Sequence, residues 1–107
     1  MIHELKIHPK FFNDVRLGKK TFEIRKNDRP FREGDFLALN EYDQVNKLYT
    51  GNSIIVYVDY ILNDPDFCKD GYVVMGIKPC DVFKRKSPIN QITMQEDYSI
   101  PLATKKN

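Results

Sequence analysis

The chain has few of the residues that build metal and redox sites, with two cysteines and two histidines among 107 residues. Cys68 and Cys80 lack the close spacing of a redox or zinc pair, so we expect both to be reduced and structural. His3 and His8 would face opposite sides of one extended strand, which makes them a poor metal pair. His3 shares a face with apolar residues and is expected to be a hydrogen-bonded core histidine. We therefore predict no metal site and no cofactor.

A long apolar run is also missing. The longest one, Ser53–Leu62, contains Asp59 and is far shorter than the roughly 20 residues of a membrane helix. Residues 1–10 mix charged and apolar side chains, unlike a signal peptide. The chain has no internal repeat and no glycine-rich loop of the type that nucleotide hydrolases use. We expect a cytoplasmic protein that does not enter a membrane.

Neither sign of charge dominates, because the net charge is only +2. Residues 1–80 carry twelve Lys and Arg against twelve Asp and Glu, and residues 81–107 carry five against three. A protein that coats phosphates without selection needs a larger positive excess. If this chain recognises a nucleic acid, the local arrangement of its charges must provide the affinity.

The pattern of apolar and turn residues predicts an α+β fold that is mainly β, a small mixed barrel. Pro9 suits the first turn of a helix and Gly18 suits its C-terminal cap, with Phe11 and Phe12 assigned to the core. The strand at 53–62 is expected to be central because both of its faces are largely apolar. The predicted strands cover residues 2–7, 21–25, 36–42, 53–62 and 71–78.

The barrel domain is expected to occupy residues 1–80. Residues 81–107 then form a C-terminal extension, partly ordered or flexible, with a basic cluster at Lys84–Lys86. Ser87-Pro88 suits the start of a short helix that would end near Glu96. Such an extension is either a solvated appendage or a basic arm that folds over a ligand.

One segment, GKKTFEIRKNDR at residues 18–29, carries the densest chemistry. Its polar residues alternate with Phe22 and Ile24, which predicts a strand with one apolar and one polar face. The polar face either forms a cleft wall with ammonium, guanidinium and carboxylate groups, or is the ordinary solvent-exposed face of a half-buried strand.

The order of elements, residues 18–25 and the Gly34-Asp35 turn together resemble the ASCH domain of the PUA-like superfamily, over about residues 1–79. The continuation at residues 26–29, with residues 49–51 and 71–74, is similar to a branch of uncharacterised bacterial and phage proteins. The resemblance implies a PUA-like pseudo-β-barrel with one main helix between the first two strands. It also implies a cleft beside that helix that binds RNA or a modified nucleobase.

The resemblance places the cleft motif on Lys20, Glu23 and Arg25, while the residues that follow belong only to the branch. Guanidinium groups suit phosphate or a base edge, a carboxylate suits the amino groups of a base, and Tyr42 or Tyr72 suits base stacking. Glu41 is a further candidate, with Arg25 as its expected partner. The candidate ligand-binding residues are Lys19, Lys20, Thr21, Glu23, Arg25, Asn27, Asp28, Arg29 and Glu41.

Two other functions stay open. Some ASCH members are amidohydrolases that act on an acylated cytidine through Lys, Thr and Glu, and the resemblance places Lys20 at the lysine position. Here Glu23 fills the threonine position, and the family's downstream glutamate has no match. Apart from the resemblance, a different reaction stays open in which Glu23 or Glu41 activates water as a general base beside Lys20, so Lys20 and Glu23 are the catalytic candidates. Alternatively, the cleft closes on another chain or on the extension, as in a protein-interaction module. We expect RNA or a modified nucleotide as the partner and make no prediction of oligomeric state.

Overall fold

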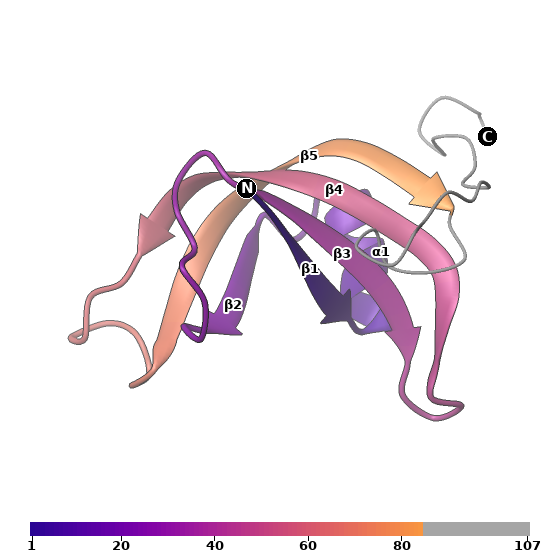
Figure 1. Ribbon diagram of the computed structural model, residues 1–107, viewed down its shortest axis with the longest axis horizontal. Coiled ribbons are helices and arrows are strands. Elements are labelled where there is room, and N and C mark those ends of the chain that lie inside the picture. The colour runs from indigo at the N-terminus through magenta and orange to yellow at the C-terminus, as the bar shows by residue number, and fades with distance from the viewer. Residues whose placement is uncertain (85–107) are drawn as a thin grey trace.

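The computed structural model describes residues 1–84, which form one strongly curled sheet and one helix (Figure 1). The elements are β1 (Ile2–Ile7), α1 (Pro9–Arg16), β2 (Phe22–Lys26), β3 (Phe36–Asp43), β4 (Leu48–Leu62) and β5 (Tyr72–Lys84). The strand order is β1-β3-β4-β5-β2. Strands β1 and β3 are parallel and the other neighbours are antiparallel. The fold is therefore α+β and mainly β, as predicted, with β1 and β2 at the two edges of a half-barrel.

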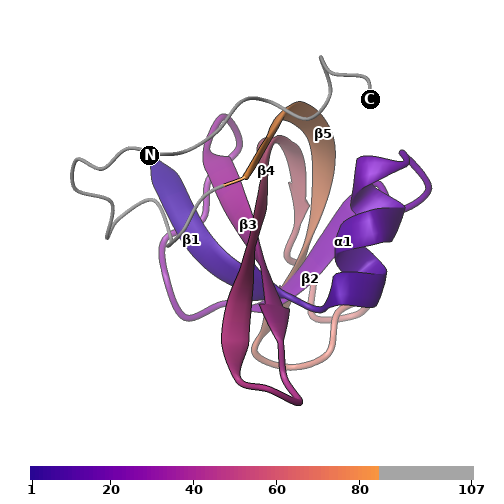
Figure 2. The same ribbon diagram turned by 90° about the vertical axis from the view of Figure 1, so that its right-hand side faces the viewer.

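The helix α1 begins with Pro9 at its first turn and ends before Gly18, which has a φ of 77°. It packs against β3 and β5 on one side of the curled sheet (Figure 2). Phe12 and Val15 face the core, as their helical spacing predicts. The assignment of Phe11 to the core is wrong, because a short helix buries one narrow stripe and Phe11 lies beside it, 43% exposed.

The central position predicted for β4 is confirmed by the strand order. The strand begins earlier than predicted, at Leu48, because Tyr42 and Tyr49 already pair across a tight turn at residues 44–47. Ile54, Val56 and Val58 are fully buried on its inner face, whereas Tyr57 on the outer face is 38% exposed. Strand β5 likewise continues beyond residue 78 to residue 84.

The core lies on the inner face of the curl. Val73, Met75 and Ile77 of β5 are buried there, as predicted. His3 is also buried and forms a 2.7 Å hydrogen bond from its ring Nε2 to Oδ2 of Asp35, which confirms the prediction of a paired core histidine. The backbone N–H of Arg32 donates to the same carboxylate at 3.0 Å. Burial raises the pKa of Asp35, but these hydrogen bonds and the N-terminal ammonium outweigh it and hold the pKa below its ordinary value.

In β2 the charged side chain is buried and the apolar side chains are exposed, which is the reverse of an ordinary half-buried strand. Glu23 is only 3% exposed, whereas Phe22 is 42% and Ile24 is 54% exposed. Strand β2 is an edge strand, so its inner face looks into the opening of the half-barrel instead of into apolar packing. The alternating pattern thus places charge inside and apolar side chains outside.

Other predictions concern features outside the core. Cys68 and Cys80 are free thiols. Within the described part, no group of His, Cys, Asp and Glu side chains is arranged to hold a metal ion. No helix in residues 1–84 is long and apolar enough to cross a membrane. The short helix predicted at residues 87–96 lies outside the described residues.

Candidate functional site

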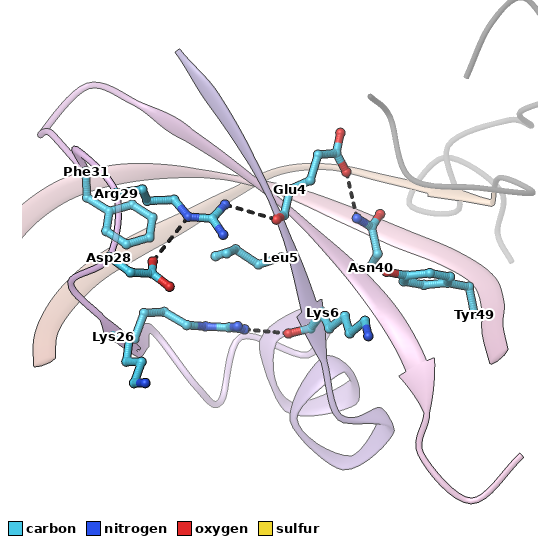
Figure 3. Close-up of a pocket in the computed structure, with 10 residues that line it drawn as sticks. Glu4, Leu5, Lys6, Lys26, Asp28, Arg29, Phe31, Asn40 and Tyr49 are labelled. Atoms are coloured by element: carbon cyan, nitrogen blue, oxygen red, sulfur yellow. Dashed lines mark hydrogen bonds and ion pairs between the residues drawn. The ribbon is translucent and has the colours of Figure 1, made fainter. Parts of the chain in front are cut away.

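The opening between the two sheet edges is bridged by arginine side chains (Figure 3). Arg25 of β2 donates from Nη2 to the main-chain carbonyl of Lys6 in β1 at 2.8 Å. Arg29, in the turn after β2, donates from Nη1 to the main-chain carbonyl of Glu4 at 3.3 Å. Side-chain donors thus take the place that a neighbouring strand would occupy along the edge of β1.

A buried carboxylate anchors one of these arginines. Glu23 accepts from Lys20 Nζ at 2.6 Å through Oε2 and from Arg25 Nε at 2.9 Å through Oε1. The ammonium of Lys20 also donates to the main-chain carbonyl of Phe22 at 2.7 Å. The side chains of Lys20 and Arg25 are 16% and 22% exposed. A carboxylate this deeply buried needs such partners, because its desolvation is costly.

Two adjoining clefts flank the Arg25 bridge. The helix-side cleft has a volume of about 420 Å³ and is lined by Phe11, Lys20, Phe22 and Glu23, among others. The turn-side cleft has a volume of about 380 Å³, and its lining includes Lys26, Arg29, Phe31 and Tyr49. Lys6 and Arg25 line both clefts. We call the two clefts together the groove.

Aromatic rings form part of each cleft wall. In the helix-side cleft, Lys20 Nζ lies 5.5 Å from the ring centroid of Phe11 and 4.9 Å from that of Phe22. Both rings are more than 40% exposed, which is high for phenylalanine. In the turn-side cleft, Tyr49 makes an edge-on contact with Tyr42, with ring centroids 5.0 Å apart. Both clefts therefore offer flat apolar surface beside cations.

The groove concentrates positive charge in a part of the chain that is neutral overall. Five Lys and Arg side chains line it against three carboxylates, whereas residues 1–80 contain twelve of each. Lys20 and Arg25 are paired with Glu23, and Arg29 lies 3.4 Å from Asp28. Lys6 and Lys26 have no carboxylate partner among the described residues. The local excess is thus carried by two unpaired ammonium groups.

The structure brings together only part of the predicted site. Lys20, Glu23 and Arg25 converge on the helix-side cleft, and Arg25, Asp28 and Arg29 on the turn-side cleft. Lys19, Thr21 and Asn27 line neither cleft.

The predicted pairing of Glu41 is wrong. Its carboxylate accepts from Thr50 Oγ1 at 2.7 Å and from Asn52 Nδ2 at 2.9 Å, across the β3–β4 hairpin, and not from Arg25. The proposed stacking residues also lie elsewhere. Tyr42 packs beneath the Lys6 ammonium and Tyr72 beneath that of Lys69, and neither ring lines the groove.

Sequence reasoning missed the residues that β1, β3 and β4 contribute. Asn40 is 4% exposed and donates to Glu4 Oε1 at 2.7 Å, while Ser53 donates to Asn40 at the same distance. Lys6 and Tyr49 line the groove because the sheet curls, and no local sequence pattern indicates that either residue lies there. For Phe22 the sequence does carry a signal, since it stands between Lys20 and Glu23 of the predicted cleft motif, whereas Phe11 lies nine residues before Lys20.

Residues 2–77 match the family described as "Domain of unknown function (DUF3850)", and the chain belongs to that family. It is also 38% identical over 74 residues to a protein of Escherichia phage P2, described as "Uncharacterized 12.9 kDa protein in GpA 3'region". That alignment covers 69% of this chain and 65% of the phage protein, so the chain spans just under two thirds of its relative. Every residue that lines the groove lies inside the family match.

Proposed function

We propose that this protein is an ASCH-type, PUA-like domain that binds single-stranded RNA or a modified nucleotide in the groove. The observation that supports this most strongly is the helix-side cleft. There, two exposed phenylalanine rings flank Lys20, whose ammonium is fixed by a buried Glu23 and backed by Arg25. Flat apolar surface, cations and a carboxylate are the three features that a nucleotide uses, for its base, its phosphate and its amino groups.

The phenylalanine rings suit an unpaired base. Stacking of a base on an aromatic ring contributes about 1–3 kcal/mol and does not depend strongly on the base. Phe11 comes from α1 and Phe22 from β2, so both rings are carried by regular elements. Because the Lys20 ammonium lies near both rings, a base would stack on the open face of one ring and would not enter between them.

The charged groups suit the rest of the nucleotide. Nη1 of Arg25 has no hydrogen-bond partner among the described residues, because the bonds to Glu23 and Lys6 use Nε and Nη2. It is available to a phosphate oxygen. Oε1 of Glu23 faces both Nε and Nη2 of Arg25, whereas Oε2 accepts from Lys20 alone and so has a second lone pair for an amino or imino group. This favours recognition of a base over simple phosphate binding.

Titration of labelled RNA tests the proposal. A single-stranded RNA octamer of mixed sequence should bind, and its affinity should fall between 50 and 200 mM salt. Phe22→Ser should weaken binding by about 5- to 150-fold, the equivalent of one stacking interaction. Phe36→Ser is the matched control, because Phe36 is 38% exposed and packs on Tyr57 away from the groove. Negligible, salt-insensitive binding to single-stranded and hairpin RNA alike would overturn the proposal.

An amidohydrolase is the second candidate, favoured by one distance. Lys20 Nζ lies 2.6 Å from the Glu23 carboxylate, within the reach that a nucleophile and its base require. Two acceptors already hold the ammonium, which suits a fixed cation better than a free amine. Incubation with N4-acylated cytidine and measurement of the released acid decides between the functions. Release of the acid that Lys20→Ala abolishes would support the amidohydrolase function. If no acid is released, nucleotide binding stays the proposed function.

A further inference from the structure

We infer that the groove takes a dinucleotide step of single-stranded RNA. One base lies in each cleft, and the phosphate that links them lies over the Arg25 bridge, beside Lys6 and Lys26 of the cleft lining. This rests on the proposed function, and it adds a minimum ligand length, a second base site and the position of one phosphate.

The two clefts are adjacent parts of one groove. Both are lined by Lys6 and Arg25, and the hydrogen bond from Arg25 to the Lys6 carbonyl crosses the groove between them. The bond runs from β2, which also carries Lys26, to β1, which carries Lys6, and Figure 3 shows the side chains of Lys6 and Lys26 at opposite sides of the cleft. A ligand that fills both clefts must therefore cross the bridge.

The bridge has the charge that a phosphate requires. Neither Lys6 nor Lys26 has a carboxylate partner within the described part of the chain, and Nη1 of Arg25 has no acceptor there. The ammonium of Lys6 lies 4.2 Å from the ring centroid of Tyr42, which holds its side chain beside the groove. Three cationic side chains with unused donors thus line the turn-side cleft, and two of them, Lys6 and Arg25, also line the helix-side cleft.

The turn-side cleft has walls that suit a second base. Phe31 packs edge-on against His3, with ring centroids 4.8 Å apart, and Tyr49 packs in the same way against Tyr42. These contacts fix the two rings before any ligand arrives, which lowers the entropic cost of binding. The volumes of both clefts, about 380 and 420 Å³, fall in the range of about 300–1,000 Å³ that is typical of small-molecule sites.

A comparison of ligands with equal phosphate content tests this inference. The full chain is titrated by calorimetry with the four nucleoside 5′-monophosphates and with ApA, CpC, GpG and UpU, each of which carries one phosphate. The two sets then differ in the second nucleoside and in charge, since a phosphomonoester carries about −1.5 to −2 at pH 7 and a phosphodiester carries a single negative charge. The charge difference favours the mononucleotides, so tighter binding of a dinucleotide reports the second nucleoside. We expect the best dinucleotide to bind at least tenfold more tightly than the best mononucleotide.

Substitutions locate the second base and the phosphate. Lys6→Ala and Lys26→Ala should each weaken dinucleotide binding several-fold, and Lys69→Ala, which lies outside both clefts, should not. Tyr49→Leu should bring the ratio of dinucleotide to mononucleotide affinity close to one. Thermal melts of every variant check that the fold is kept.

The possible outcomes separate the two proposals. Equal affinity for mononucleotides and dinucleotides, with no effect of Tyr49→Leu on the ratio, would overturn the two-base groove and leave nucleotide binding in place. Absence of binding by mononucleotides, dinucleotides and the RNA octamer would overturn both. A tenfold preference for dinucleotides that Tyr49→Leu removes and Lys69→Ala preserves would support both.

Discussion

The guanidinium of Arg25 donates to the main-chain carbonyl of Lys6 at 2.8 Å and so joins the two edge strands of the sheet. The same guanidinium is held from behind by Glu23, at 2.9 Å from Nε and 2.8 Å from Nη2. A planar fork makes both contacts at once, which a lysine ammonium cannot do. One side chain therefore both closes the half-barrel and forms the boundary between its two clefts.

The first prediction concerns this fork. Arg25→Lys keeps the charge and removes at least one of the two contacts, so we expect a loss of roughly 1–3 kcal/mol in the free energy of unfolding. Urea denaturation followed by circular dichroism measures it. A variant as stable as the parent protein would show that the bridge between β1 and β2 does not contribute to stability.

The second prediction concerns the buried carboxylate. Glu23→Ala leaves Lys20 and Arg25 without their counter-charge in a partly buried position, and we expect a loss of roughly 3 kcal/mol in unfolding free energy. Glu23→Gln should cost less, because the amide oxygen still accepts a hydrogen bond. The two variants are compared in the same denaturation experiment. If both were as stable as the parent protein, the ion pairs of Glu23 with Lys20 and Arg25 would not contribute to stability.

The third prediction tests the reversed polarity of β2. Ile24 is 54% exposed, so Ile24→Thr should change the unfolding free energy by no more than about 0.5 kcal/mol. Ile54→Thr, the same change at a fully buried site, should cost at least about 2 kcal/mol. If the Ile24 variant were the more damaging, β2 would have its apolar face inside.

The fourth prediction concerns acid stability. The pKa of Asp35 is lower when folded than when unfolded, so its contribution is full above its ordinary pKa of about 3.8 and is lost as the pH falls through the lower, folded value. Asp35→Asn should therefore be less stable than the parent at pH 6, and the gap should narrow below pH 4. Unfolding curves measured from pH 2 to pH 6 check this, and a gap that is independent of pH would contradict it.

Much of the fold could be predicted from local patterns. Pro9 and Gly18 mark the ends of the helix segment, and alternation along β1 and along Val73, Met75 and Ile77 of β5 identifies strands. The interior position of β4 followed from its apolar composition. These features depend on backbone preferences and on periodicity, which are properties of neighbouring residues.

The rest depends on contacts that are distant in sequence. Alternation in β2 indicated two faces, but only the curl of the sheet makes the polar face the inner one. Lys6 and Arg25 meet because β1 and β2 are opposite edges of that curl. The strand face that Glu41 shares with Leu37 and Leu39 predicts a paired carboxylate, but its partners are Thr50 and Asn52, which the tight β3–β4 turn places beside it, and not Arg25.

The most direct test of the central claim is to locate bound RNA on the protein. Amide and side-chain chemical shifts of the isotope-labelled full chain are recorded as a single-stranded RNA octamer is added. The account predicts that the largest changes fall on residues 4–8, 20–31 and Tyr49, around the groove. Changes confined to the outer face near Phe36 and Tyr57, with the groove unchanged at saturation, would contradict it.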